Sequence, residues 1–88
     1  MLRTPLRMEV FITFKVGKCR IAELCDNLGL EHAQLAAKVG LAKSQISDYI
    51  SLRNLPSIER AYNIAKVLGC APEDLYEWIE VSDSNTEG

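Results

Sequence analysis

The spacing of Ala36, Gly40 and Ile46 constrains the middle of this chain to a sharp corner between two helices. Helices that cross at a steep angle leave room for little more than a methyl group at the contact, and Ala36 supplies one. Gly40 can adopt the positive φ that reverses the chain. Ile46 then returns an apolar side chain to the core. The spacing therefore predicts a helix over residues 31–39 and another over residues 43–52.

Helical periodicity continues on both sides of this corner. Apolar residues at helical spacing predict a first helix from Lys18 to Leu28, followed by a glycine stop. Another such stripe predicts a helix over Ile58–Leu68, with Ser57 as its N-cap. Pro72 at a first helical position, followed by two acids, predicts a fifth helix that ends near Trp78.

The two ends of the chain carry the composition of β-strands. Residues 10–17 alternate with period two, and their apolar positions are Val10, Ile12, Phe14 and Val16. Residues 78–81 are the comparable stretch near the other end. Because a lone strand is unstable, we expect these stretches to pair, either within one chain or across a dimer. We predict an all-α five-helix domain over 18–79, preceded by an extension with a possible strand (1–17) and followed by an acidic tail (80–88).

Composition and charge favour a one-domain protein with a basic body. The chain has 88 residues, of which 48% are hydrophobic and 25% charged, as in soluble globular domains. It has neither a run long enough to span a bilayer nor a signal peptide, so we expect no membrane partner and a cytoplasmic location. Residues 1–71 carry ten Lys and Arg against six acids, whereas residues 72–88 carry six acids and no base. This asymmetry suits a DNA-binding face with the tail turned away, and equally a tail that is merely solvated.

Cysteine and histidine usage argues against metal or catalytic chemistry. Cys19, Cys25 and Cys70 have no Cys-x-x-Cys spacing, and the single histidine, His32, lies far from all of them in sequence. We therefore expect free thiols that pack as small apolar groups, and no metal site. The chain shows no nucleophile–base pair and no phosphate-binding loop, so we expect no catalytic residue, no cofactor, no small-molecule ligand and no enzymatic activity.

The segments around the corner resemble a known family. The chain is similar to the helix-turn-helix domains of the lambdoid phage repressor and Cro (XRE-like) family, and the matching segments are residues 30–40, 44–49 and 61–70 with Leu75. The resemblance covers roughly residues 18–79. It implies a five-helix DNA-binding domain, often dimeric, that represses or otherwise regulates genes of phages, mobile elements and chromosomes.

The chain departs from this family at two places. The third helix of such domains often ends in a glycine, and this chain has Leu52 there. Asn54 is the residue that we expect to take the left-handed conformation instead. Many relatives also link the first and third helices by an Arg–Glu pair, and Cys25 and Ile50 stand at those places. We expect plain apolar packing between them.

The third predicted helix would present one face to DNA. Ile46, Tyr49 and Ile50 turn inward, and the N-terminal half of a recognition helix enters the major groove. The expected base contacts come from Lys43, Ser44, Gln45 and Asp48. Lysine can donate to guanine, glutamine can pair with adenine, and aspartate can accept from cytosine. For Asp48, a local charge balance with Lys43 is an equal alternative.

A second set of residues flanks this face and is suited to the phosphate backbone. The set consists of His32, Gln34, Ser47, Ser51, Arg53 and Asn54. The free N–H groups at the start of the second helix can hold a phosphate. The resemblance implies such a contact at His32, although a merely exposed histidine is the alternative. Arg53 is the strongest candidate, because a guanidinium forms charge-assisted hydrogen bonds. Lys18 and Arg20 are further candidates at the start of the first helix.

The expected partners are a double-stranded DNA operator and a second copy of the chain. Tyr49, Tyr62, Tyr76 and Trp78 fit packing better than base stacking, because they lie in register with aliphatic residues. Any part of the Trp78 region that the small core cannot cover would form a dimer face. The predicted function is a sequence-specific transcriptional regulator, most simply a Cro-like repressor of a phage or mobile element. The alternative is a protein-interaction module or an antitoxin-like partner protein that keeps the fold.

Overall fold

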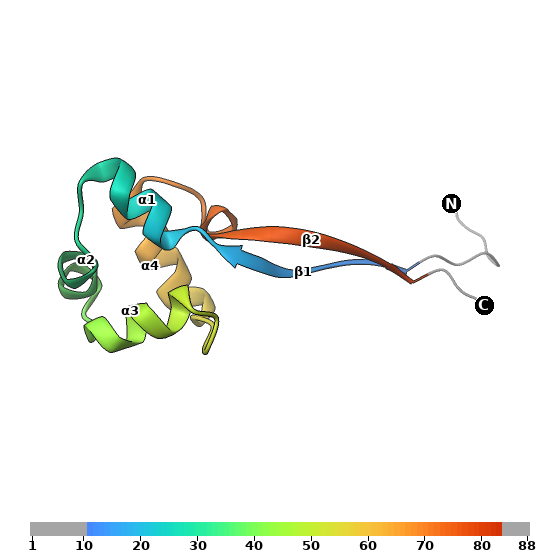
Figure 1. Cartoon of the computed structure of the whole chain (residues 1–88), viewed down its shortest axis with the longest axis horizontal. Coiled ribbons are helices and arrows are strands. Elements are labelled where there is room, and N and C mark those ends of the chain that lie inside the picture. Colours follow the sequence, from blue (N-terminus) through green and yellow to red (C-terminus); the bar gives the residue numbers. More distant parts are fainter. Residues whose placement is uncertain (1–10, 84–88) are drawn as a thin grey trace.

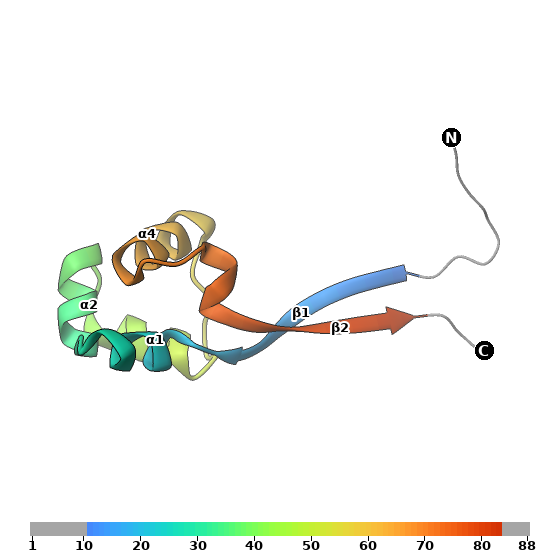
Figure 2. The same cartoon turned by 90° about the horizontal axis from the view of Figure 1, so that it is seen from above.

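The computed structural model describes residues 11–83, which form a helical body and a long two-stranded arm (Figure 1). The elements are, in chain order, β1 (Phe11–Cys19), α1 (Ile21–Leu28), α2 (His32–Val39), α3 (Lys43–Ile50), α4 (Ile58–Leu68), the 3-10 helix η1 (Pro72–Leu75) and β2 (Tyr76–Asp83). Seen from above, the twisted arm leaves one end of the body (Figure 2). The molecule measures 51 × 27 × 21 Å, so it is elongated along the arm.

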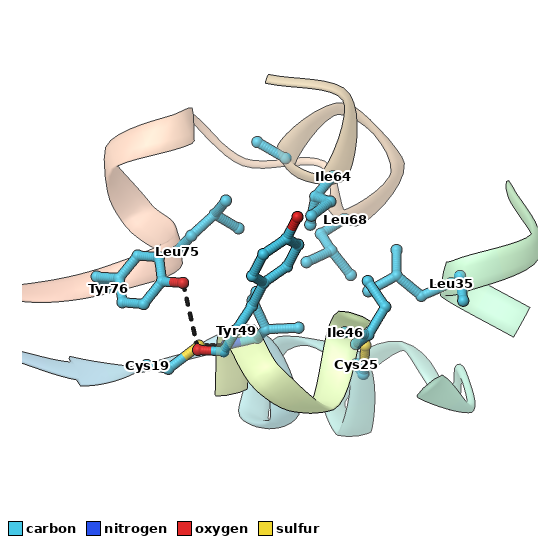
Figure 3. Packing of buried hydrophobic residues seen from close by; sticks show 12 residues of the cluster. Cys19, Cys25, Leu35, Ile46, Tyr49, Ile64, Leu68, Leu75 and Tyr76 are labelled. Carbon is cyan, nitrogen blue, oxygen red and sulfur yellow. Dashed lines mark hydrogen bonds between the residues drawn. The ribbon is translucent and has the colours of Figure 1, made fainter. Parts of the chain in front are cut away.

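The core lies where the four α-helices, η1 and the base of the arm meet (Figure 3). Its buried residues are Cys19, Ile21, Cys25, Leu35, Ala36, Ile46, Tyr49, Ile64, Ala65, Leu68, Leu75 and Tyr76. The predicted inward stripes of the central helices supply most of this set. Burial raises the pKa of the Cys19 and Cys25 thiols, so both stay protonated and pack as apolar groups, as predicted, whereas Cys70 is also free but only half-buried.

Some apolar residues that we expected to pack remain exposed. Tyr49 and Tyr76 are buried, and the Tyr76 hydroxyl donates to the Tyr49 carbonyl at 3.4 Å. Tyr62 and Trp78 are instead about half exposed, which corrects the expectation that all the aromatics pack. Ile58 was expected on the inward stripe of α4, but it is 88% exposed because the first turn of α4 projects beyond the core.

The bounds of α2 and α4 agree with the prediction to within one residue. The Ser57 hydroxyl accepts a hydrogen bond from the Arg60 N–H at 3.2 Å, which confirms the N-cap. The first helix, however, starts at Ile21 and not at Lys18. The preceding residues continue β1 through an irregularity between Val16 and Cys19, so Lys18 belongs to the strand.

The predicted fifth helix is wrong, and the described residues contain four α-helices. Pro72–Leu75 forms one turn of 3-10 helix, and the chain then extends as β2. The carbonyl of Leu75 accepts from the Arg20 N–H at 2.7 Å, and the carbonyl of Glu73 accepts from the Trp78 indole at 2.7 Å. These two hydrogen bonds hold Arg20 against Leu75 and the Trp78 indole against Glu73, and they favour the extended path of β2 over another helical turn.

The terminal strands pair within one chain, which confirms one of the two predicted arrangements. β1 and β2 are antiparallel, with Phe14 opposite Glu80 and Val16 opposite Trp78. β2 extends to Asp83, so residues 80–83, assigned to the acidic tail, form the end of this ribbon. Gly17 permits the close approach of the two strands, because a Cβ there would lie 3.1 Å from the Ile79 side chain and the Glu77 carbonyl.

The third helix ends at Ile50, two residues earlier than predicted. Leu52, and not Asn54, takes the left-handed conformation, with φ of 64°. The N–H groups of Arg53 and Asn54 both donate to the Asp48 carbonyl, at 2.9 and 3.3 Å. The chain must therefore reverse immediately after α3, and Leu52 occupies the place where the resemblance led us to expect a glycine.

The corner glycine gives a test of the backbone assignment. Gly40 has φ of 72° and open space around its Cβ position, so substitution there introduces backbone strain without a clash. Gly40→Val should lower the free energy of unfolding by about 2 kcal/mol, measured by urea denaturation. Ala42→Val is the control, because Ala42 has φ of −78° and ψ of 150°, which suit valine. Equal stabilities of the two variants would contradict the assignment.

Some predictions fall outside the described residues, namely those on residues 1–9, on Val10 and on the tail after Asp83. Within the described range, no helix has the length and apolar character that crossing a membrane requires.

Candidate nucleic-acid interface

Helices α2 and α3 meet at the predicted corner. Gly40 caps α2 in the left-handed conformation, and the Leu41 N–H then donates to the Ala36 carbonyl at 2.9 Å. Ala36 is buried at the crossing, and Ile46 is completely buried beneath it. These contacts fix the direction in which α3 leaves the corner.

The two faces of α3 differ sharply in burial. Ile46 and Tyr49 are buried and Ile50 is half-buried. On the opposite side, Lys43, Ser44 and Ser47 are exposed, while Gln45 and Asp48 are half-buried. The structure therefore brings the predicted base-contacting residues together on one accessible side of a single helix.

Both glutamines at the helix starts are held by the backbone. Gln45 Oε1 accepts from the Ala42 N–H at 2.9 Å, and Gln34 Oε1 accepts from the Glu31 N–H at 2.8 Å. Each amide oxygen thus accepts the backbone N–H of the residue that precedes its helix, which is one half of a capping box. This contact fixes the orientation of the amide and leaves its NH₂ group as the part able to donate to a ligand.

The loop after α3 is organised around Asp48. The Asp48 carboxylate lies 3.6 Å from Arg53 Nη1 and 3.5 Å from Asn54 Nδ2, and its carbonyl accepts from the Ser51 hydroxyl at 3.2 Å. The charge partner of Asp48 is therefore Arg53, whereas the sequence had suggested Lys43. The structure brings the predicted phosphate-contacting residues of this loop together at the end of α3.

Two of the predicted residues, His32 and Lys43, line a shallow hollow beside the start of α3. His32 and Lys43 border it, with Asp26, Glu31 and the loop between α1 and α2, and its volume is about 440 Å³. The hollow combines cationic and anionic side chains, so it is not a purely basic pocket. His32 lies in the first turn of α2, where backbone N–H groups lack helical partners.

Sequence reasoning missed Arg60 as a neighbour of this surface. Its Nη1 donates to the Tyr49 hydroxyl at 3.0 Å, and it borders a hollow of about 180 Å³ with Gln45, Asp48 and Asn54. Its position after an N-cap indicates only a solvent-facing residue of α4. Arg60 comes close to α3 because α4 begins directly beneath the loop that follows α3. No local sequence pattern indicates this proximity.

Comparison with known proteins identifies this arrangement. The sequence model of the family described as "Helix-turn-helix" matches residues 21–75, which is more than half of the chain. The chain belongs to the helix-turn-helix family. It is also 40% identical over 68 residues to the SPbeta prophage-derived uncharacterized HTH-type transcriptional regulator YopS of Bacillus subtilis (strain 168). That match covers 76% of this chain and 92% of the relative.

The two further basic candidates of this helix-turn-helix domain, Arg20 and Lys18, differ in whether their side chains are free to contact a phosphate. Arg20 donates to the Asp74 carbonyl at 3.1 Å and pairs with Glu23 at 3.2 Å, so it ties the start of α1 to η1. Lys18 is exposed but lies on the arm. Arg20 therefore has a structural role that its sequence position did not indicate.

Proposed function

We propose that this helix-turn-helix protein is a sequence-specific DNA-binding transcriptional regulator, which inserts α3 into the major groove. The observation that carries the proposal is the division of α3 into a buried face and an exposed polar face directly after a fixed corner. A helix held this way can enter the groove, about 12 Å wide, without rearrangement of the body. The relative named a transcriptional regulator supports the same function.

For the base contacts we propose Lys43, Ser44 and Gln45. Lys43 and Ser44 are exposed at the first turn of α3, the part of a recognition helix that penetrates deepest. The Gln45 amide oxygen already accepts one backbone hydrogen bond, so its NH₂ group is the better-placed donor to a base edge. The Asp48 carboxylate already contacts Arg53 and Asn54, so we assign Asp48 chiefly to holding these two residues.

For the phosphate contacts we propose two clusters, on either side of the recognition helix. One is formed by His32 and Gln34 in the first turn of α2, and the other by Ser47, Ser51, Arg53 and Asn54. The Arg53 side chain is 75% exposed, and its ion pair with Asp48 is long at 3.6 Å. A phosphate oxygen can therefore compete for the guanidinium.

We further infer that the protein acts in the cytoplasm as a homodimeric repressor of a phage or mobile-element operator. A single short helix reads too few base pairs for specific binding. Two copies related by a two-fold axis would read half-sites about 34 Å apart.

Salt dependence of binding tests this function against a protein-interaction module. The purified protein should bind a random duplex at low salt, and a selected operator more tightly. Both affinities should fall steeply, by about a thousandfold between ~50 and ~200 mM salt for six or more phosphate contacts. Fluorescence anisotropy with labelled duplexes measures both. Absence of binding to any duplex at low salt would contradict DNA binding and favour the interaction module.

A further inference from the structure

One face of the arm carries its largest exposed apolar side chains. The antiparallel register places Ile12, Phe14 and Val16 on the same side of the ribbon as their partners Ser82, Glu80 and Trp78. Of these, Phe14 is 61% exposed and Ile12 is 55% exposed. Of these six residues four are apolar, Ser82 is polar and Glu80 is charged. The face thus presents three large apolar side chains, those of Ile12, Phe14 and Trp78, that the described part of the chain leaves about half exposed.

This face continues into a groove on the helical body. Val16 and Trp78, at the base of the arm, border a groove of about 350 Å³ with Leu55, Ile58 and Tyr62. The groove is lined mainly by apolar groups. Together, the exposed residues of arm and groove form one surface, here called the apolar stripe, which consists of Ile12, Phe14, Leu55, Ile58, Tyr62 and Trp78.

The apolar stripe is too large to be an ordinary feature of a monomer's surface. From the exposed fractions of its residues, it presents roughly 700 Å². A standard protein–protein interface buries about 800 Å² per partner. A two-stranded ribbon without further packing is also marginal in water, so the arm needs a cover to keep its length.

We propose that a second copy of this chain covers the apolar stripe, so that the stripe of one protomer packs on that of its partner about a two-fold axis. An isologous interface requires a self-complementary surface, and a mostly apolar face, with its acids Glu80 and Glu73 beside the apolar residues, meets that condition. The area available on each protomer matches what a stable dimer needs. This inference rests on the homodimer of the proposed function and adds the surface that makes it.

Sedimentation and the fluorescence of the single tryptophan, Trp78, test the proposal without DNA. The wild-type chain should sediment as a dimer. Dilution over about a hundredfold range of concentration should dissociate it and shift the Trp78 emission to the red, because dissociation exposes the indole to water. The two transitions should coincide.

Phe14→Lys removes an apolar anchor and keeps the ribbon intact. Phe14 lies opposite Glu80, so the new lysine gains a cross-strand ion pair within its own chain. This variant should raise the dimer dissociation constant at least tenfold. Thr13→Lys is the matched control, because it adds the same charge at the neighbouring position on the opposite face. It should leave dimerisation unchanged.

Ile58→Glu tests the part of the apolar stripe that lies in the groove of the helical body, away from the arm. Ile58 is 88% exposed, so the substitution removes no core contact, and an acid at the first position of α4 suits the helix dipole. This variant should also raise the dissociation constant at least tenfold, with an unchanged circular dichroism spectrum. Dimers that survive both Phe14→Lys and Ile58→Glu would overturn the proposal.

Deletion of residues 1–10 distinguishes a second copy from the chain's own N-terminal segment. If the wild type is monomeric and the deletion shifts Trp78 emission to the red, that segment covers the stripe and the proposal is wrong. If the wild type is monomeric and the deletion leaves the Trp78 emission unchanged, the proposal is also wrong. DNA binding is scored separately on a half-site duplex. If the Phe14→Lys protein is monomeric and binds a half-site, both the proposed DNA binding and the proposed dimer surface are supported. If the wild-type chain is a dimer that binds no DNA, only the dimer surface is supported.

Discussion

Replacing Ile46 with alanine should lower the free energy of unfolding by about 3 kcal/mol. Ile46 is completely buried where α2, α3 and α4 meet, and alanine would leave a cavity that the surrounding helices cannot close. A domain of this size has only moderate total stability, so the loss should lower the melting temperature by roughly 15 °C. Thermal denaturation followed by circular dichroism measures it.

The control for this experiment is Leu28→Ala, at the end of α1. Leu28 is 56% exposed, so its truncation should cost well under half as much. Both variants must be compared at one protein concentration, because dimerisation makes the melting temperature depend on concentration. If Ile46→Ala were no more harmful than Leu28→Ala, Ile46 could not be the plug of the corner.

The helices that were predicted correctly are those whose local signals agree with their tertiary contacts. The α4 segment has an N-cap serine, a helical apolar stripe and a glycine stop, and its bounds match the structure. The corner at Gly40 was also predictable, because only a few residue types permit its crossing and its reversal. In these segments, the residues that are close in sequence are also the residues whose contacts define the structure.

The wrong fifth helix shows where local signals lose to distant partners. Pro72 and the acids after it favour a helix start, and one turn does form. A distant partner then favours the extended path, since the Arg20 N–H, more than fifty residues away in sequence, donates to the Leu75 carbonyl. The pairing of β1 with β2 then offers the alternating residues after Leu75 a ladder that one more helical turn could not match.

The candidate interface divides in a similar way. The exposed side of α3 follows from helical periodicity, so the identity of its residues could be predicted from Ile46 and Tyr49 alone. The pairing of Asp48 with Arg53 could not be predicted, because it depends on the left-handed conformation of Leu52. Leucine rarely adopts that conformation. Arg60 was missed because its proximity depends on the path of the same loop.

Two substitutions in this interface should separate base recognition from backbone binding. Gln45→Ala should weaken binding to the selected operator by about 1–3 kcal/mol and change random-duplex binding little, because it removes a donor to a base edge. Arg53→Ala should weaken operator and random duplex by the same factor, about tenfold. It should also reduce the slope of log affinity against log salt by about one per protomer, because each guanidinium neutralises one phosphate.

Lys15→Ala is the matched control, since it removes the same charge as Arg53→Ala from the exposed arm, away from α3. Its affinity for both duplexes should stay close to that of the wild type. The comparison is decisive because net charge changes equally in the Lys15 and Arg53 variants, so only the position of the cation differs. If the three variants weakened binding alike, or if Gln45→Ala and Arg53→Ala both bound operator normally, α3 and its loop would not be the surface that meets DNA.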